Sequence, residues 1–172
     1  MSSRLTAVTT TTLLDHRLFG IADDGADEDL PFPHEAGDWV CAGRSSILVE
    51  TPFDSDEAVL RLEEWDGEPA EDHEWDDVVA VTIACPSGTI RLNQVTAGWA
   101  DPGFTLTRPG DQHVRLSCRF GDGDDPGFLV QFWPATTTGQ RYSSRSWDSR
   151  SVSTRRPTTA LPAPPARSAA NR

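Results

Sequence analysis

The sequence predicts an all-β fold, an antiparallel β-sandwich of about seven to nine strands with a disordered C-terminal tail. Two observations support this fold class. Hydrophobic and polar residues alternate in short runs, which is the period of a strand with one buried face. Turn-forming residues, mainly Asp, Pro and Gly, separate these runs at intervals of roughly ten residues, a spacing typical of all-β sandwiches. The 172 residues leave room for one such domain and an appendage.

The first part of the chain contains the less regular strand signals. Strands are expected over residues 5–14, 17–22, 38–41 and 47–50. Residues 57–65 allow two interpretations. Ala58, Leu60 and Leu62 would share one face of a strand, but the segment also fits a helix that begins at a capping pair formed by Asp54 and Glu57. We favour the strand, because the neighbouring segments are strands.

The second part of the chain contains the clearer signals. Strands are expected over residues 79–83, 89–94, 104–107, 113–120 and 128–133. The alternation is cleanest where Val114, Leu116 and Cys118 are interleaved with polar residues, so this strand should have one buried and one solvent-facing side. Pro134 ends the last run, because proline cannot donate a hydrogen bond to a neighbouring strand.

Composition divides the chain near residue 137. Residues 1–137 are expected to form the acidic β-sandwich domain. Residues 138–172 are rich in Ser, Arg, Pro and Ala and are expected to form a disordered basic tail, since they would bury too little surface to offset their chain entropy. The net charge of −12 therefore has two parts. Residues 1–140 carry 8 arginines and 26 acids, a charge of −18, whereas residues 141–172 carry 7 arginines and one acid, a charge of +6.

This charge restricts the partners of the folded domain. An acidic body repels phosphates, so we expect it to bind no nucleic acid and no anionic membrane surface. The charge suits a basic protein such as a nuclease or toxin, or it simply serves solubility. The longest near-continuous apolar run, Val78–Cys85, is far shorter than the ~20 residues that cross a bilayer.

The three cysteines indicate the cellular compartment of the protein. Cys41, Cys85 and Cys118 are widely spaced and odd in number, and none belongs to a C-x-x-C pair. Buried, reduced thiols are the simplest interpretation, and reduced thiols are typical of the cytoplasm. We therefore expect a cytoplasmic protein.

Metal-binding and catalytic motifs are incomplete. His34-Glu35 and His73-Glu74 each lack the second histidine of an H-E-x-x-H site. Asp122, Asp124 and Asp125 are weak candidates for a hard cation such as Ca²⁺, but their segment lacks the EF-hand register, and a solvated turn is the preferred interpretation. A divalent-metal-dependent hydrolase that uses this loop remains an alternative.

Acid–base and nucleophile pairs are also missing from the sequence. Glu63 and Glu64 are adjacent, so in a strand they point to opposite faces and cannot flank one bond. Cys118 and His113 would likewise lie on opposite faces of one strand. We therefore expect no catalytic residue, no cofactor and no enzymatic activity.

Tryptophan is the most suggestive surface signal. Two of the six tryptophans, Trp65 and Trp75, stand in acidic, turn-rich surroundings. The candidate binding residues are Trp65, Asp66, Glu68, Trp75, Asp76 and Asp77. Aromatic rings beside carboxylates bind sugars or cations, tryptophans anchor protein interfaces, and packing in the core is the simplest alternative. The expected function is a binding module for a protein partner, with a carbohydrate- or small-ligand-binding module as the alternative.

Three sequence elements carry a resemblance to a known family: Trp65-Asp66-Gly67-Glu68-Pro69, Val114-Arg115-Leu116 and Phe128–Ala135. With these, the stretch from Trp65 to Ala135 resembles small, acidic, uncharacterised β-domain proteins of actinobacteria. Those proteins are distantly similar to the competence protein J group, whose known member inhibits a DNA-uptake nuclease. The resemblance implies an inhibitor- or immunity-like function, in which an acidic domain occupies the basic cleft of its partner.

Overall fold

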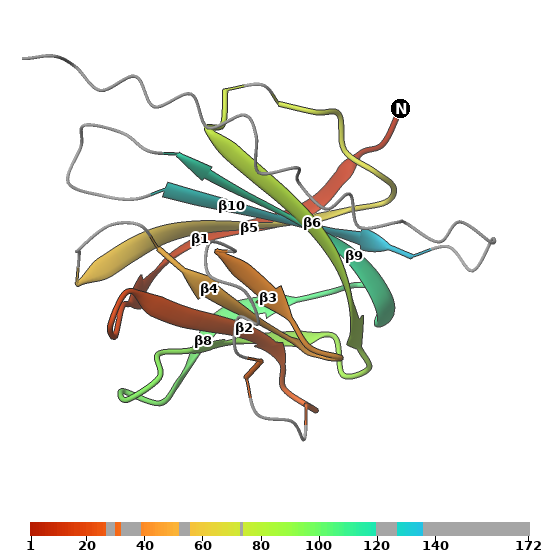
Figure 1. Ribbon diagram of the computed structural model, residues 1–172. Helices are drawn as coiled ribbons and strands as arrows, with labels where there is room; N and C mark the ends of the chain where they lie inside the picture. Colours follow the sequence, from red (N-terminus) through yellow and green to blue (C-terminus); the bar gives the residue numbers. More distant parts are fainter. Residues whose placement is uncertain (27–29, 32–38, 52–55, 73, 120–126, 136–172) are drawn as a thin grey trace, which may run out of the picture. The chain divides into compact units, whose positions relative to one another are not determined.

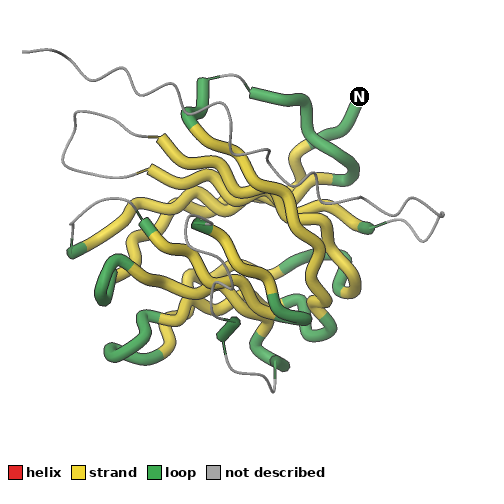
Figure 2. Tube along the Cα trace, in the orientation of Figure 1, coloured by secondary structure: helices red, strands yellow, loops and turns green. Residues whose placement is uncertain are grey.

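The computed structural model describes residues 1–26, 30–31, 39–51, 56–72, 74–119 and 127–135. These residues form ten strands and no helix (Figures 1 and 2). The strands are β1 (Arg4–Leu13), β2 (Leu18–Asp23), β3 (Val40–Ala42), β4 (Ser46–Glu50), β5 (Glu57–Trp65), β6 (Asp77–Cys85), β7 (Thr89–Asn93), β8 (Trp99–Thr105), β9 (Gly110–Arg119) and β10 (Gly127–Pro134). The all-β prediction is confirmed, and the ambiguous segment 57–65 is a strand.

The strands form two five-stranded sheets that pack face to face (Figure 1). The first sheet has the order β1-β5-β10-β9-β6, and the second has the order β3-β4-β2-β7-β8. The expected antiparallel pairing holds for every pair except β5 and β10, which run parallel. A parallel pair needs a long connection, and these two strands are separated by four others along the chain.

The core lies between the two sheets and is rich in aromatic rings. Phe19 of the second sheet meets Phe128 of the first edge to face, with ring centroids 5.3 Å apart. Phe104 and Phe132 make a similar contact across the sandwich at 5.6 Å. All four side chains are at most 2% exposed. Such pairs add to the burial of their apolar area, so they hold the two sheets in one relative position.

Connections cover parts of the outer faces as well. Gly20 in β2 lies directly beneath Leu30, and a Cβ at this position would come within 2.7 Å of the Leu30 side chain. A side chain at Gly20 would therefore require the flexible end of Leu30 to shift. On the first sheet, the outward-facing Arg115 and Ser117 of β9 are buried, although the alternation predicted a solvent-facing side there. That prediction is wrong, because a connection covers this face.

One strand extends further than its sequence predicts. Residues 104–107 were expected to form a strand, but β8 already begins at Trp99 and includes the turn-forming residues Asp101, Pro102 and Gly103. β8 is an edge strand whose pairing with β7 shifts register between Ile90 and Leu92. An irregular edge tolerates a proline, because its nitrogen need not donate to a neighbour.

Residues Met1–Thr137 form one compact unit. The expected disordered tail over residues 138–172 lies outside the described residues.

Candidate protein-binding surface

The connection between β5 and β6 forms the most acidic segment of the structure. β10 and β9 lie between these two strands in the first sheet, so residues Asp66–Asp76, called here the acidic crossover, must pass across both of them. The twelve residues 66–77 contain seven acids and no arginine. The candidate binding residues predicted from the sequence all lie on this crossover or at the strand ends that hold it.

Arg115 of β9 anchors the middle of the acidic crossover to the sheet. Its guanidinium donates hydrogen bonds to the backbone oxygens of Pro69 (3.1 Å) and Ala70 (3.3 Å) and to the carboxylate of Glu68 (3.0 Å). The same guanidinium lies over the ring of Trp133, 5.3 Å from its centroid. Arg115 is only 7% exposed. A planar group with several donors suits this combination of carbonyl, carboxylate and ring contacts.

A buried carboxylate holds the strand from which the acidic crossover leaves the sheet. Glu63 is 4% exposed on the outer face of β5. It accepts hydrogen bonds from Arg61 (2.7 Å), Arg4 (2.9 Å), Trp65 Nε1 (2.9 Å) and Gln131 (3.1 Å). Burial alone would raise the pKa of Glu63, but these hydrogen bonds outweigh it and hold the pKa below its usual value. Glu63 is therefore a charged structural centre.

Aromatic and backbone contacts hold the far end of the acidic crossover. The Trp75 indole donates a hydrogen bond to Asp72 Oδ2 (3.2 Å), and the Arg119 guanidinium lies 4.9 Å from the centroid of its ring. The Asp76 amide donates to the backbone oxygen of Cys118 (3.0 Å), which joins this end to β9. The segment is thus ordered before any partner arrives, and a preordered surface loses less entropy on binding.

The structure gives each predicted binding residue a distinct position. Trp65 and Trp75 are half-buried and use their indole N–H groups within the protein. Asp66 and Asp76 are exposed, and Asp66 accepts a hydrogen bond from the Ser3 amide (2.6 Å). Glu68 is exposed and paired with Arg115, while the half-buried Asp77 accepts from the amide of Val78. The tryptophans therefore shape the crossover, and the carboxylates are what it presents to solvent.

Sequence reasoning missed the residues that position this surface. In the sequence, Arg115 stands out only as part of the motif Val114-Arg115-Leu116, and Glu63 only as one of two adjacent acids. The two glutamates do face opposite sides, as expected. Glu64 points inward and accepts hydrogen bonds from Thr107, through its amide (2.8 Å) and its hydroxyl (2.9 Å). An arginine within an alternating strand, in a chain whose acids concentrate in the earlier segment 66–77, is the signal that could have revealed the anchor.

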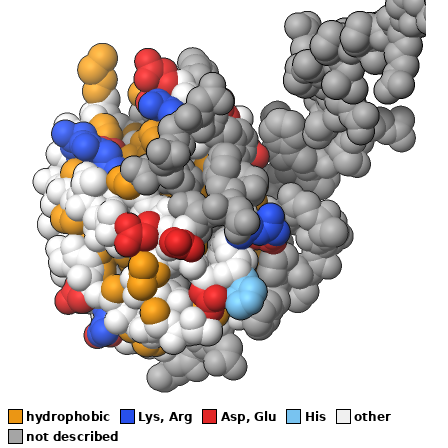
Figure 3. Space-filling view, turned by 90° about the vertical axis from the view of Figure 1, so that its left-hand side faces the viewer, with side chains coloured by type: hydrophobic (Ala, Val, Ile, Leu, Met, Phe, Trp, Pro, Cys, Tyr) orange, Lys and Arg blue, Asp and Glu red, His pale blue; other side chains and the backbone are white. Residues whose placement is uncertain are grey.

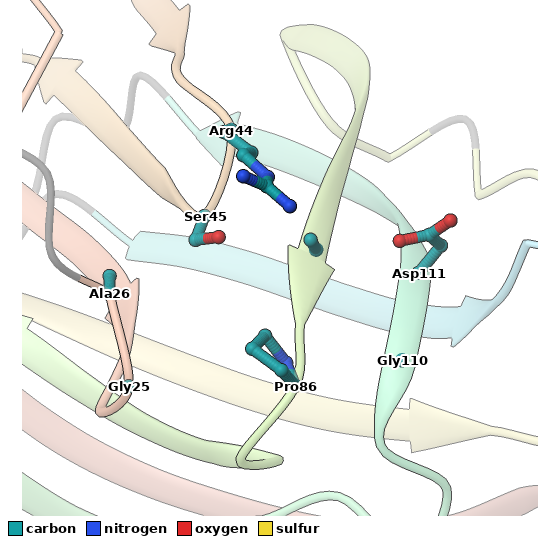
Figure 4. Close-up of a pocket in the computed structure, with 8 residues that line it drawn as sticks. Gly25, Ala26, Arg44, Ser45, Pro86, Gly110 and Asp111 are labelled. Carbon is teal, nitrogen blue, oxygen red and sulfur yellow. The ribbon is translucent and has the colours of Figure 1, made fainter.

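A shallow cleft at one end of the sandwich is the other candidate site. It has a volume of about 490 Å³ and is lined by Gly25, Ala26, Arg44, Ser45, Ala84, Pro86, Gly110 and Asp111. Figure 4 shows Arg44 and Asp111 on either side of the end of β6. The lining contains no histidine and no cysteine, so it offers no imidazole base and no thiol nucleophile.

The buried carboxylate of Asp23 holds the turns beside this cleft. It accepts hydrogen bonds from the amides of Gly25 (3.0 Å), Ser87 (3.1 Å) and Gly88 (2.9 Å) and from the Ser87 hydroxyl (2.9 Å). Gly88 has a φ of 73°, a conformation that favours glycine. Asp23 therefore ties the end of β2 to the β6–β7 turn.

The Asp23→Asn variant should lower the free energy of unfolding by roughly 1–2 kcal/mol, because one of its two acceptor oxygens becomes a donor while the amides around it remain. Urea denaturation at pH 7 measures the change. Asp24→Asn is the matched control, since this exposed carboxylate makes only a surface ion pair with Arg91 (2.6 Å). Equal losses in the two variants would contradict the structural role of Asp23.

The described residues give no support to metal or thiol chemistry. They contain no group of three His, Cys, Asp or Glu side chains that could hold a metal ion. The weak metal candidates Asp122, Asp124 and Asp125 lie outside the described residues. Cys85 and Cys118 are buried free thiols, and burial raises the pKa of each to about 12, so neither is a thiolate near neutral pH. Cys41 is half-buried.

The described part of one outer surface mixes acidic and hydrophobic side chains. In Figure 3, hydrophobic side chains lie in small groups between acidic ones. Exposed large hydrophobic residues in the structure include Val78 at 40% and Trp99 at 51%. No helix in the described ranges has the length and hydrophobicity needed to span a membrane.

Comparisons with known proteins identify the fold. No protein-family model matches the chain. No curated protein matches it either. Among solved structures, the chain is similar to ComJ from Bacillus subtilis, an inhibitor of the DNA-degrading activity of NucA, with a TM-score of 0.56 and 9% identity over 77% of this chain and 98% of ComJ. It is also similar to the product of crocagin biosynthetic gene J, with a TM-score of 0.51 and 14% identity over 76% of this chain and 97% of that one. The chain thus shares a complete β-sandwich fold with an inhibitor protein and a biosynthetic protein.

Proposed function

We propose that this protein is a non-enzymatic binding module, inhibitor-like in function, that meets a basic protein partner through the acidic crossover. The carrying observation is that six acids stand on a single connection, which Arg115 fastens to the sheet. Charge complementarity of this kind accelerates association and selects against acidic partners. The fold likeness to ComJ supports an inhibitor-like function. The basic partner, a nuclease or a toxin, would present an arginine- or lysine-rich cleft.

The proposal is tested by removing charge from the acidic crossover. We expect the triple variant Glu71→Gln, Glu74→Gln and Asp76→Asn to bind a basic partner from a native lysate about tenfold more weakly at low salt, because each exposed carboxylate adds to the steering field. Binding to the unchanged protein should fall steeply as salt is raised, since the Debye length shrinks to about 8 Å at physiological ionic strength. Quantitative pull-down with protein identification measures both effects.

A charge-matched control separates the crossover from the general acidity of the protein. Asp56→Asn, Glu57→Gln and Asp101→Asn remove the same number of exposed carboxylates from other places on the described surface. This control should keep nearly full binding. Equal loss in both triple variants would reject the crossover as the binding surface, and the absence of any salt-sensitive partner would reject the proposed function itself.

A further inference from the structure

Among the described residues, no strand pairs with the outer edge of β6, which is called here the open edge. Within the described part of the chain, β6 pairs with β9 only. The Ala84 amide points away from β9, because it donates to the backbone oxygen of Arg44 (2.7 Å). Backbone direction alternates along a strand, so the backbone groups of Ala80 and Thr82 face the same open edge. Side chains at these alternate positions lie on the outer face, and Ala80 and Thr82 are exposed.

Edge strands normally carry features that prevent a further strand from pairing with them. The other three edges of this sandwich have such features. β3 is only 3 residues long, the register of β1 shifts between Arg4 and Thr6, and β8 contains Pro102 and a register shift. β6 is 9 residues long and pairs with β9 in a regular register from end to end. Its segment Val78–Ala84 contains no proline and no charged residue.

The charge around this edge indicates what would pair with it. The acidic crossover ends where β6 begins, so Glu74, Asp76 and Asp77 stand at the start of the open strand. A second copy of this chain would bring a second body with a charge of −18 over residues 1–140 to the same place. Repulsion between two such bodies disfavours that pairing, whereas a basic strand would gain attraction from the same carboxylates.

We propose that the open edge of β6 receives an extended, basic strand of the partner, which pairs with the backbone at Ala80 and Thr82 while its cations meet the acidic crossover. This inference rests on the proposed function and adds the mode of recognition to it. Backbone hydrogen bonds along the edge supply affinity, and the outward side chains of β6 meet alternate residues of the added strand. The Val78 side chain, 40% exposed, would be covered by this strand.

The test uses a synthetic nine-residue peptide of alternating arginine and valine and the full chain. A matched peptide of the same sequence carries N-methyl groups on the amides of its central five residues, which keeps its charge but removes its backbone donors. We expect the first peptide to slow hydrogen exchange of the Ala80 and Thr82 amides by about tenfold or more. The N-methylated peptide should bind about tenfold more weakly and leave these amides unprotected.

Two variants test the same edge from the side of the protein. Ala80→Pro removes a backbone donor that faces away from β9, so the pairing of β6 with β9 should survive. Ala80→Arg keeps the backbone donor but adds a cation that repels the peptide. This variant replaces Ala80→Pro if the proline variant fails to fold. Each should weaken binding of the unmethylated peptide about tenfold, which isothermal titration calorimetry measures.

The outcomes separate this inference from the proposed function. Equal binding of the two peptides, or unprotected Ala80 and Thr82 amides in the bound state, would overturn strand pairing. The acidic crossover would then act by charge alone, and the proposed function would stand. A dimer of the protein that Ala80→Arg dissociates in sedimentation experiments would assign the edge to a second copy and also overturn the inference. Failure to find any salt-sensitive protein partner in the pull-down is a separate result, and it would reject the proposed function.

Discussion

Replacing Arg115 with alanine should destabilise the protein by roughly 2–4 kcal/mol, because the backbone oxygen of the buried Pro69 loses its charged donor and Trp133 loses the group that covers it. The acidic crossover should also become mobile, since Arg115 makes all the side-chain contacts that fasten its middle to β9 in the described residues. Urea denaturation measures the first effect. Hydrogen exchange of the amides in residues 66–76 measures the second.

Arg119→Ala is the matched control for this prediction. Arg119 also belongs to β9 and also reaches the acidic crossover, but its side chain is 50% exposed and its ion pair with Glu74 is long, at 3.6 Å. Removing it should cost less than about 1 kcal/mol, the usual limit for an exposed pair. If Arg115→Ala cost no more than Arg119→Ala, the anchoring role of Arg115 would be wrong.

Replacing Glu63 with alanine should destabilise the protein by roughly 2–3 kcal/mol at pH 7, because Gln131 and the Trp65 indole would lose a charged acceptor in a buried position. The effect should depend on pH. The pKa of Glu63 is lower in the folded protein than its ordinary value of 4.5, so its stabilisation is complete above that value and is lost as the pH falls through the lower, folded value.

The free energy of unfolding of the unchanged protein and of Glu63→Ala, measured between pH 7 and pH 3, checks this prediction. The difference between the two should stay constant from neutral pH to about pH 5 and shrink below pH 4.5. Glu57→Ala, an exposed carboxylate at the start of the same strand, controls for loss of negative charge. A difference that persisted unchanged at pH 3 would contradict a charged Glu63.

Both variants connect stability to the proposed function. Arg115 and Glu63 hold the acidic crossover and the strand that leads into it, and neither presents charge to a partner. Their replacement should weaken partner binding because a mobile segment must be ordered again when the complex forms. The charge-removing variants of the crossover should weaken binding with little loss of stability, so the two classes of variant separate positioning from recognition.

The sequence predicted the strand content well, and tertiary context explains where it failed. Alternation identified β6, β9 and β10, because side chains that alternate between core and solvent leave a period of two. The pattern could not show that Arg115 and Ser117 are buried on the outer face of β9. For Arg115 the cover comes from the acidic crossover, which this side chain contacts at Glu68, Pro69 and Ala70. The path of the crossover depends on β9 and β10, which lie between β5 and β6 in the sheet but follow both in the sequence.

The candidate site was likewise predicted in part from the sequence and decided in part by tertiary contacts. Composition and spacing pointed to Trp65, Asp66, Glu68, Trp75, Asp76 and Asp77 as one acidic, aromatic group. What each of them does was not visible, because the partners that decide it are distant along the chain: Arg115 for Glu68, Ser3 for Asp66 and Arg119 for Trp75. Tertiary contacts show that the indole N–H groups of both tryptophans donate hydrogen bonds within the protein, to Glu63 and Asp72.

The sequence by itself determined that the chain is all-β, that its acids concentrate before β6 and that it lacks complete catalytic motifs. These properties depend on local composition and on the period of the strands, both of which a linear sequence contains. Only the tertiary structure decided the strand order, the parallel pairing of β5 with β10, the ordered acidic crossover and the open edge of β6. These features arise from contacts between residues far apart in the chain, where the cost of closing long loops is repaid by burial and hydrogen bonding across the sheets.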